Sequence, residues 1–270
     1  MTWLLVAACV AAFVWELSLG QRGMDTALAV LGFTPDTLSG ADAPSEAIGV
    51  PSYATIFISM FLHGGFLHLG GNMLYLWIFG NNIEEAMGHA RYTLFYFVCG
   101  FFAALMMVFI DPHSHVPMIG ASGAISGVLG AYMLLYPRAR VHVIIPLGII
   151  FYPIWIRAVW VVGIWFGMQL LSAALTDPSQ PGTAFWAHVG GFCAGLVLHA
   201  CPEIARRAIL RAVYPAWPMV LALAQLSLPT SSRRSAAFQS GSPCPPKILG
   251  RAVCEAQEFA SVGRILEPVA

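Results

Sequence analysis

The residues best suited to chemistry by type and spacing include a serine and a histidine. Ser122 stands in the run Gly120-Ala121-Ser122-Gly123 at the start of an apolar segment, and His188 begins the run His188-Val189-Gly190-Gly191. A serine hydroxyl is a weak nucleophile until a base removes its proton, and an imidazole is suited to that task near neutral pH. At a helix N-terminus, backbone N–H groups also favour a developing oxyanion. The pair therefore predicts acyl transfer, with Ser122 as nucleophile and His188 as general base.

A purely structural interpretation of these surroundings competes with the catalytic one. Gly123, Gly127 and Gly130 recur at helical spacing, and small residues at such spacing also form packing faces between membrane helices. Taken alone, the run around Ser122 favours packing. Gly191 and Gly195 extend the face of His188 in the same way. We expect these small residues to let the two helices approach closely enough for a Ser–His hydrogen bond.

A third segment supplies further polar side chains. His68 and Asn72 are four positions apart, so they share one face of a helix, and His63 precedes them. Imidazole and amide N–H groups can donate to an oxyanion, and removing one such donor typically costs about 10²–10³ in rate. We expect an oxyanion hole formed by His68, Asn72 and the backbone N–H of Ser122. We expect His63 to line the same cavity.

The composition places these residues in a membrane. Apolar residues make up 58% of the chain and charged residues 10%, against about 25% charged residues in a typical soluble domain. The formal net charge is zero, which argues against nucleic acid as a partner. The six cysteines include no CxxC pair, so neither a disulfide framework nor a zinc knuckle is indicated. His113 and His115 share a loop, but loop histidines rarely bind metal, and we expect no metal site.

Several segments are apolar and long enough to cross a bilayer, which takes about 20 residues. The six expected spans are 1–19, 66–87, 92–110, 118–136, 158–175 and 184–201. We expect a long loop over 20–62 and an interfacial segment over 143–156, which contains Pro146 and Pro153. The predicted fold is all-α: a six-helix membrane core over 1–205 and a poorly ordered cytoplasmic tail over 206–270.

The distribution of arginines orients these spans. One set of loops carries Arg91, Arg138, Arg140, Arg157, Arg206, Arg207 and Arg211, whereas the opposite set carries only Arg22. The positive-inside rule therefore puts both termini in the cytoplasm. The second, fourth and sixth spans then all enter from the outer side. At 1.5 Å per residue, Ser122 and His188 would each lie about 6 Å below the start of their helices.

In order and spacing, four motifs resemble those of the rhomboid intramembrane serine proteases. They are the HxxxxHxxxN run ending at Asn72, Gly80-xxx-Glu84-xxx-Gly88, the run around Ser122, and Ala187-His188-x-x-Gly191. The resemblance extends from His63 to about Pro202. It implies a six-helix bundle and a Ser122–His188 dyad without an aspartate. It also implies the oxyanion hole named above and a structural role for Glu84 at the cytoplasmic end.

The resemblance further implies the activity and its setting. Members of that family are serine endopeptidases that cut single-span membrane proteins in or near their transmembrane segments, on the outer side of the membrane. Substrates enter laterally beside the second and fifth helices. The family implies no cofactor, metal or nucleotide. The expected location is a bacterial inner membrane, where the lipid bilayer surrounds the protein.

One position departs from the family pattern. Some relatives carry an aromatic residue four positions after the nucleophile, where it packs against the base, and here that residue is Ser126. His188 must then be oriented by another group, and Tyr132, Trp186 or a water molecule remain open.

Two other functions compete with proteolysis. A catalytically inactive relative would bind membrane clients as a scaffold, which the presence of both Ser122 and His188 argues against. A transporter or channel would show internal repeats and charged residues near the bilayer midplane, and the sequence shows neither.

Overall fold

The computed structural model describes residues 1–39, 43–147, 150–177 and 182–199. These residues belong to one compact unit, Met1–Ala208. The tail expected over 206–270 lies outside the described residues.

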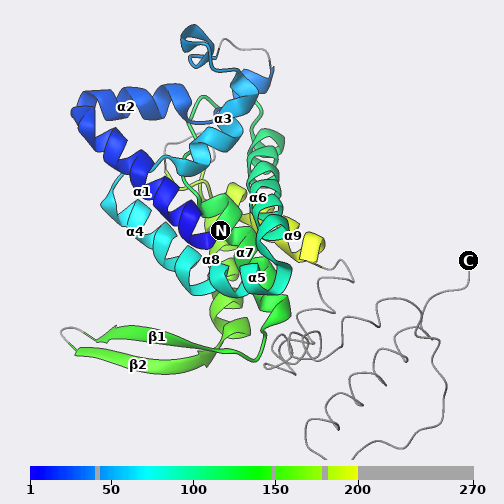
Figure 1. Ribbon diagram of the computed structural model, residues 1–270. Coiled ribbons are helices and arrows are strands. Elements are labelled where there is room, and N and C mark those ends of the chain that lie inside the picture. The colour runs from blue at the N-terminus through cyan, green and yellow to red at the C-terminus, as the bar shows by residue number, and fades with distance from the viewer. Residues whose placement is uncertain (40–42, 148–149, 178–181, 200–270) are drawn as a thin grey trace, which may run out of the picture. The chain divides into compact units, whose positions relative to one another are not determined.

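The described chain is mostly helical (Figure 1). Its α-helices are α1 (Thr2–Ser18), α2 (Gly20–Leu31), α3 (Ser52–Ile58), α4 (Phe66–Tyr75), α5 (Asn81–Met87), α6 (His89–Ile110), α7 (Ser122–Leu135), α8 (Ala158–Leu175) and α9 (Phe185–His199). A π-helical turn over Leu76–Gly80 joins α4 to α5, and short 3₁₀ turns cover Pro35–Ser39, Glu46–Ile48 and Ser59–Phe61. The strands are β1 (Arg140–Leu147) and β2 (Ile150–Arg157).

Within the described residues, α6 and α8 are long and apolar enough to cross a membrane. A third crossing is added if Ser52–Phe61 and Phe66–Met87, bent by 83°, count as one span. The helices α1, α7 and α9 are apolar but shorter. Each segment that the sequence marks as a span overlaps one of these helices. The fourth begins later than expected, at Ser122 rather than at residue 118.

The prediction of a continuous loop over 20–62 was wrong. Residues 20–31 form α2 and residues 52–58 form α3. Ala27, Leu28 and Ala29 favour a helix, and Met24 is buried on its inner side. The glycines and charged residues of α2 lower its mean hydropathy, so hydropathy alone does not reveal this helix.

The all-α prediction was wrong for the segment 143–156, which forms an antiparallel hairpin paired from Arg140↔Arg157 to Leu147↔Ile150. Alternating β-branched and aromatic residues favour strands, and both strands are edge strands, where proline is tolerated. The rings of His142 and Trp155 stack across the pair at 4.4 Å. Because the chain returns to its starting point, this segment adds no crossing.

The backbones of α7 and α9 lie in direct contact. A Cβ atom added to Gly191 would overlap the carbonyl oxygen of Gly123, and one added to Gly195 would overlap that of Gly127. Glycine is therefore required at both positions of α9, since any side chain would push the helices apart. Around this contact, the buried side chains of Tyr96, Leu129 and Phe192 form part of the main hydrophobic core.

The buried carboxylate of Glu84 joins three helices. It accepts a hydrogen bond of 2.7 Å from the backbone N–H of Thr2, at the start of α1. It also contacts the imidazole of His89, at the start of α6, and the amino group of Met1. Glu84 itself belongs to α5, so its contacts hold α1, α5 and α6 together.

The α7–α9 contact yields a stability prediction. Gly191→Ala and Gly195→Ala should each lower the free energy of unfolding by about 1–3 kcal/mol, because the added methyl group overpacks a backbone contact. Thermal unfolding in detergent, followed by tryptophan fluorescence, measures the loss. Gly163→Ala on α8 is the matched control, since an added Cβ there meets open space, and it should be neutral or stabilising. Equal losses at Gly163 and Gly195 would contradict the backbone contact.

Candidate active site

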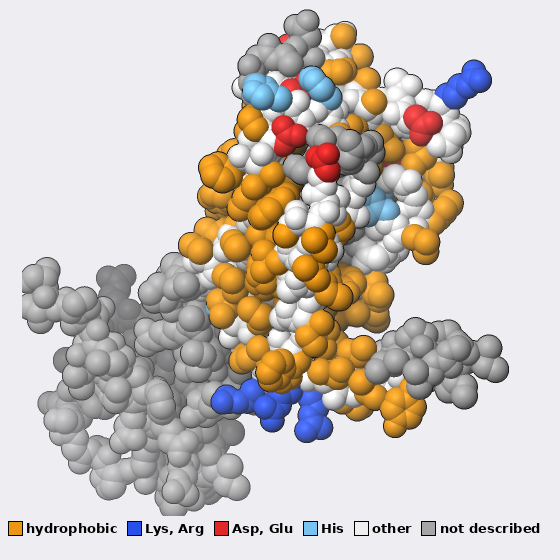
Figure 2. Space-filling view, turned by 180° about the vertical axis from the view of Figure 1, so that it is seen from behind, with side chains coloured by type: hydrophobic (Ala, Val, Ile, Leu, Met, Phe, Trp, Pro, Cys, Tyr) orange, Lys and Arg blue, Asp and Glu red, His pale blue; other side chains and the backbone are white. Residues whose placement is uncertain are grey.

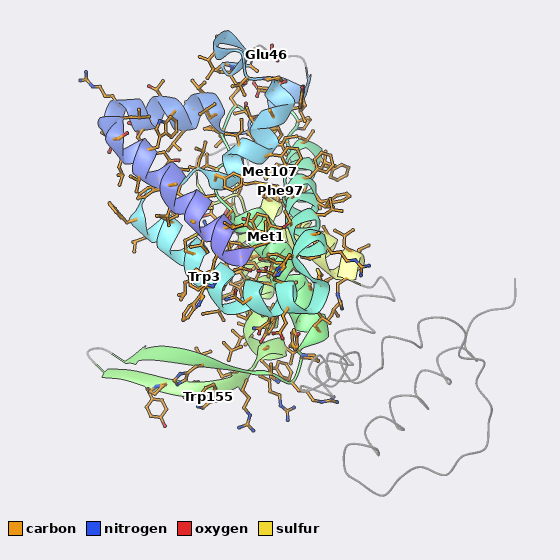
Figure 3. The ribbon with its side chains drawn as sticks, in the orientation of Figure 1. Met1, Trp3, Glu46, Phe97, Met107 and Trp155 are labelled. Atoms are coloured by element: carbon orange, nitrogen blue, oxygen red, sulfur yellow. The ribbon has the colours of Figure 1, made fainter. Side chains whose placement is uncertain are left out.

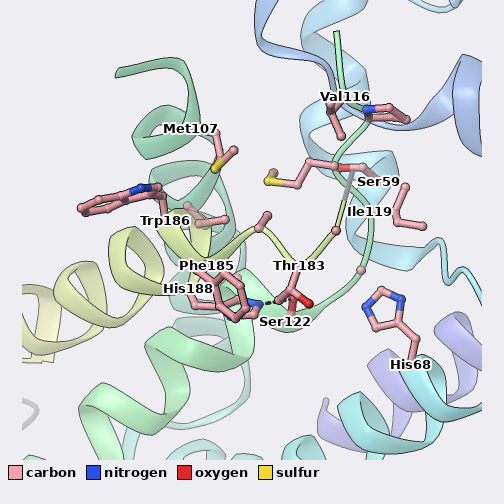
Figure 4. A pocket seen from close by; sticks show the side chains of 18 of the residues that line it. Ser59, His68, Met107, Val116, Ile119, Ser122, Thr183, Phe185, Trp186 and His188 are labelled. Atoms are coloured by element: carbon pink, nitrogen blue, oxygen red, sulfur yellow. Dashed lines mark hydrogen bonds between the residues drawn. The ribbon is translucent and has the colours of Figure 1, made fainter. Parts of the chain in front are cut away.

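A cavity of about 520 Å³ opens among α4, α6, α7 and α9 (Figure 4). Ser122, His188 and His68 all line it. The loop 116–120 and the residues before α9 complete its wall. Three side chains that the sequence places far apart therefore face one space.

Ser122 and His188 are hydrogen bonded to each other. The distance from His188 Nε2 to Ser122 Oγ is 2.8 Å. Ser122 is the first residue of α7, and His188 lies in the first turn of α9. The expected depth of Ser122, about 6 Å below a helix start, was wrong, because the backbone turns at Gly120 and the helix begins only afterwards. The serine consequently lies beside the free N–H groups of a helix N-terminus.

Gly120 determines how the backbone approaches this site. Its φ is +107°, a conformation that residues with a side chain rarely adopt. A Cβ atom at this position would lie 2.6 Å from Nε2 of His68 and 3.5 Å from the amide nitrogen of Asn72. The backbone N–H of Gly120 donates to the carbonyl of Ser59 at 2.8 Å. A glycine here therefore lets the chain pass close to His68 and Asn72 immediately before Ser122.

The tautomer of His68 follows from its hydrogen bond. The backbone N–H of Gly64 donates to Nδ1 of His68 at 3.4 Å. Because Nδ1 accepts, the ring proton of a neutral His68 is on Nε2. That nitrogen is the one next to Gly120, so it presents an N–H donor at the cavity.

Asn72 and His63 are not among the residues that line the cavity. Asn72 is buried, and among the described residues its amide nitrogen has no hydrogen-bond partner. His63 is fully buried, its Nδ1 lies 3.0 Å from the carbonyl of Phe61, and its ring centroid is 5.1 Å from that of His68. The expectation that His63 lines the cavity is therefore not met, because its ring is covered by its neighbours.

The second ring nitrogen of His188 has a partner that sequence reasoning missed. Nδ1 of His188 lies 2.7 Å from the side-chain oxygen of Gln169 on α8. Tyr132 instead packs on Phe79, with ring centroids 4.9 Å apart, and Trp186 packs in the cluster of Ala103 and Met107. The sequence did offer one signal for this partner. Gln169 is a polar side chain within an apolar span, and such side chains are candidates for function.

Ser126 makes a local contact instead of approaching His188. Its hydroxyl donates to the carbonyl of Ser122 at 2.7 Å. The ring of His188 is flanked by Trp165 and Phe185, with centroids 6.2 and 6.4 Å away. Aromatic neighbours thus come from α8 and α9 in place of the position on α7.

In the part of the chain that the structure describes, no three histidine, cysteine, aspartate or glutamate side chains gather as a metal site would require. His115 instead contacts Asp36, with 2.6 Å between its Nδ1 and the carboxylate. This pair joins the segment after α2 to the loop that lines the cavity.

Comparison with known proteins relates this chain to one family. A family model described as the rhomboid domain matches residues 51–202, more than half of the chain. The chain is 27% identical to RHOMBOID-like protein 4 of Arabidopsis thaliana over 70% of its own length and 44% of that protein. It is 41% identical to Rhomboid protease GluP of Bacillus subtilis over 28% of its length and 14% of that protein. It is 31% identical to Rhomboid-type serine protease 2 of Emericella nidulans over 53% of its length and 26% of that protein.

The chain thus spans less than half the length of each of these relatives. The rhomboid domain match includes α4 to α9 and with them every residue of the cavity wall named above. The chain belongs to the rhomboid family of polytopic integral membrane proteins.

Proposed function

We propose that this protein is a serine endopeptidase that hydrolyses peptide bonds in or near the transmembrane segments of single-span membrane proteins. The observation that carries the proposal is the 2.8 Å hydrogen bond between Ser122 and His188 in the wall of a cavity. The names of two relatives, a rhomboid protease and a rhomboid-type serine protease, support the same activity.

The reaction proceeds by acyl transfer. Nε2 of His188 accepts the hydroxyl proton as Oγ of Ser122 attacks the substrate carbonyl, and the resulting oxyanion receives hydrogen bonds from the backbone N–H of Ser122, Nε2–H of His68 and the amide of Asn72. His188 then gives the proton to the departing amine, and water hydrolyses the acyl-enzyme by the reverse sequence. The unpartnered amide nitrogen of Asn72 beside Gly120 supports its role as a donor.

We also propose six membrane spans, formed by α1, by α4 with α5, and by α6, α7, α8 and α9. Figure 2 shows hydrophobic side chains over the middle of the described part, with Asp and Glu towards one end, where Lys or Arg also occurs, and a cluster of Lys or Arg at the other end. This separation supports cytoplasmic termini in a plasma membrane and a cavity that opens to the outer side.

The hairpin is proposed to lie in the membrane interface on the cytoplasmic side. The side chain of Trp155 is 64% exposed, and Figure 3 shows it pointing away from the helices. Tyr152 is exposed as well. Tryptophan and tyrosine favour the headgroup region, which fits a segment that leaves the helices and returns beside Arg140 and Arg157.

The inactive scaffold remains the alternative function, and the dyad tests it. Ser122→Ala and His188→Ala should each abolish cleavage of a tagged single-span substrate co-expressed with the protein, because one removes the nucleophile and the other the base. Product is measured by immunoblot, and its mass locates the cut. Ser18→Ala and His113→Ala, which alter the same residue types at exposed positions, should leave cleavage unchanged. Cleavage by Ser122→Ala at the native rate would contradict the assignment of the dyad. Absence of cleavage of several substrates by the native protein would favour the scaffold function.

The oxyanion donors make a kinetic prediction. His68→Ala and Asn72→Ala should each lower kcat by about 10²–10³ with little change in KM, because the donors act mainly on charge that develops in the transition state. The measurement is cleavage of a purified substrate in detergent or liposomes. An unchanged kcat in either variant would remove that residue from the oxyanion hole.

The proposed topology is tested by alkaline phosphatase fusions, which are active only on the outer side of a bacterial membrane. A fusion after Asp111 should be active and a fusion after Arg138 inactive, because one span separates the two positions and the arginines stay inside. The opposite pattern would reverse the orientation, and equal activities would contradict a crossing by α7.

A further inference from the structure

Gln169 occupies the side of α8 that faces α9. Val162, Trp165, Phe166 and Ala173 fall on the same stripe at helical spacing, and Val162 and Ala173 are buried. The ring of Phe166 stacks on that of Phe192 of α9, with centroids 4.0 Å apart and planes 16° apart. This stack anchors α8 on α9 about one turn from the glutamine.

The glutamine reaches the one nitrogen of His188 that the serine does not use. Nδ1 lies 2.7 Å from Oε1 of Gln169 and Nε2 lies 2.8 Å from Oγ of Ser122. An amide oxygen can only accept, so this contact requires the ring proton on Nδ1. Nε2 is then unprotonated and takes the hydroxyl proton of the serine. His188 is 8% exposed, so little water is available to replace this partner.

We propose that Gln169 is the positioning residue of the general base. Its side-chain oxygen accepts Nδ1–H of His188, holds the ring in the tautomer and orientation that attack by Ser122 requires, and stabilises the imidazolium that forms when the proton moves. This inference rests on the proposed function and names a third member of the same site, drawn from α8.

An amide differs from a carboxylate in this position. Rotation of the amide by 180° would present an NH₂ donor to Nδ1 and favour the unproductive tautomer, whereas a carboxylate can only accept. A carboxylate also raises the basicity of a neighbouring imidazole, since an opposite charge within about 4–6 Å shifts a pKa by about 1–3 units. Glutamate at this position therefore gives a signature that a merely structural residue would not.

The experiment compares Gln169→Leu, Gln169→Glu and the control Met168→Leu in the purified full-length protein, with cleavage of a single-span substrate followed from pH 5 to pH 9. Met168 is the neighbouring residue on α8 and is 54% exposed, so its replacement should leave the kinetics native. Gln169→Leu removes the acceptor at similar volume and should lower kcat about 10–100-fold, with KM within about twofold.

Gln169→Glu should restore kcat on the alkaline side to within about threefold of the native value. It should also move the acid limb of the rate profile up by about one pH unit or more, because a stabilised imidazolium loses its proton only at higher pH. Labelling of Ser122 by a fluorophosphonate should follow the same order, which separates reactivity of the serine from substrate binding.

The outcomes distinguish the two proposals. If the native protein cleaves, Ser122→Ala is silent and Gln169→Leu cleaves at the native rate, the proposed function stands and the role of Gln169 is overturned. If the acid limb of the pH–rate profile of Gln169→Glu stays at its native position, the role of Gln169 is overturned as well. If the native protein and Ser122→Ala give equal cleavage, or neither cleaves nor is labelled, the proposed function fails and this inference fails with it.

Discussion

Contact between the backbones of α7 and α9 is the constraint on which the rest of the site depends. Gly191 lies against the carbonyl of Gly123, and Gly195 against that of Gly127. Ser122 immediately precedes Gly123, and His188 lies about one helical turn before Gly191. The approach that packs the helices therefore also fixes the Ser–His distance of 2.8 Å. Inside a membrane, where lipid is as apolar as leucine, such close packing is a principal force between helices.

The segment that leads into Ser122 is held from outside the helix pair. Phe33 and Met118 exchange two backbone hydrogen bonds of 3.0 and 2.7 Å, and Gly120 donates to Ser59. The loop of the cavity wall is thus fixed by the chain between α1 and α4, which the sequence predicted to be one long loop. Its helices and turns orient the residues just before Ser122.

Polar groups around the site take their partners from different elements. His188 contacts Gln169 of α8, His68 accepts from the turn before α4, and the hydroxyl of Ser126 donates to the carbonyl of Ser122. Unpaired polar groups are costly away from water, so each of these bonds selects one orientation of the side chain. Two buried nitrogens near His68 have no partner within the described residues: the amide nitrogen of Asn72, beside Gly120, and Nε2 of His63.

The sequence alone determined the apolar segments, their order and the residue types of the site, because hydropathy and motif spacing are local properties. It placed Ser122, His188 and His68 on separate helices that had to converge. It missed α2, α3 and the hairpin, where glycines and prolines mask the local pattern, and it placed His63 on a cavity whose lining residues do not include it. Only the tertiary structure identified Gln169 as the partner of His188. Which side chain fills the second hydrogen bond of a buried imidazole depends on the rotation of one helix against another, and no spacing along the chain records that rotation.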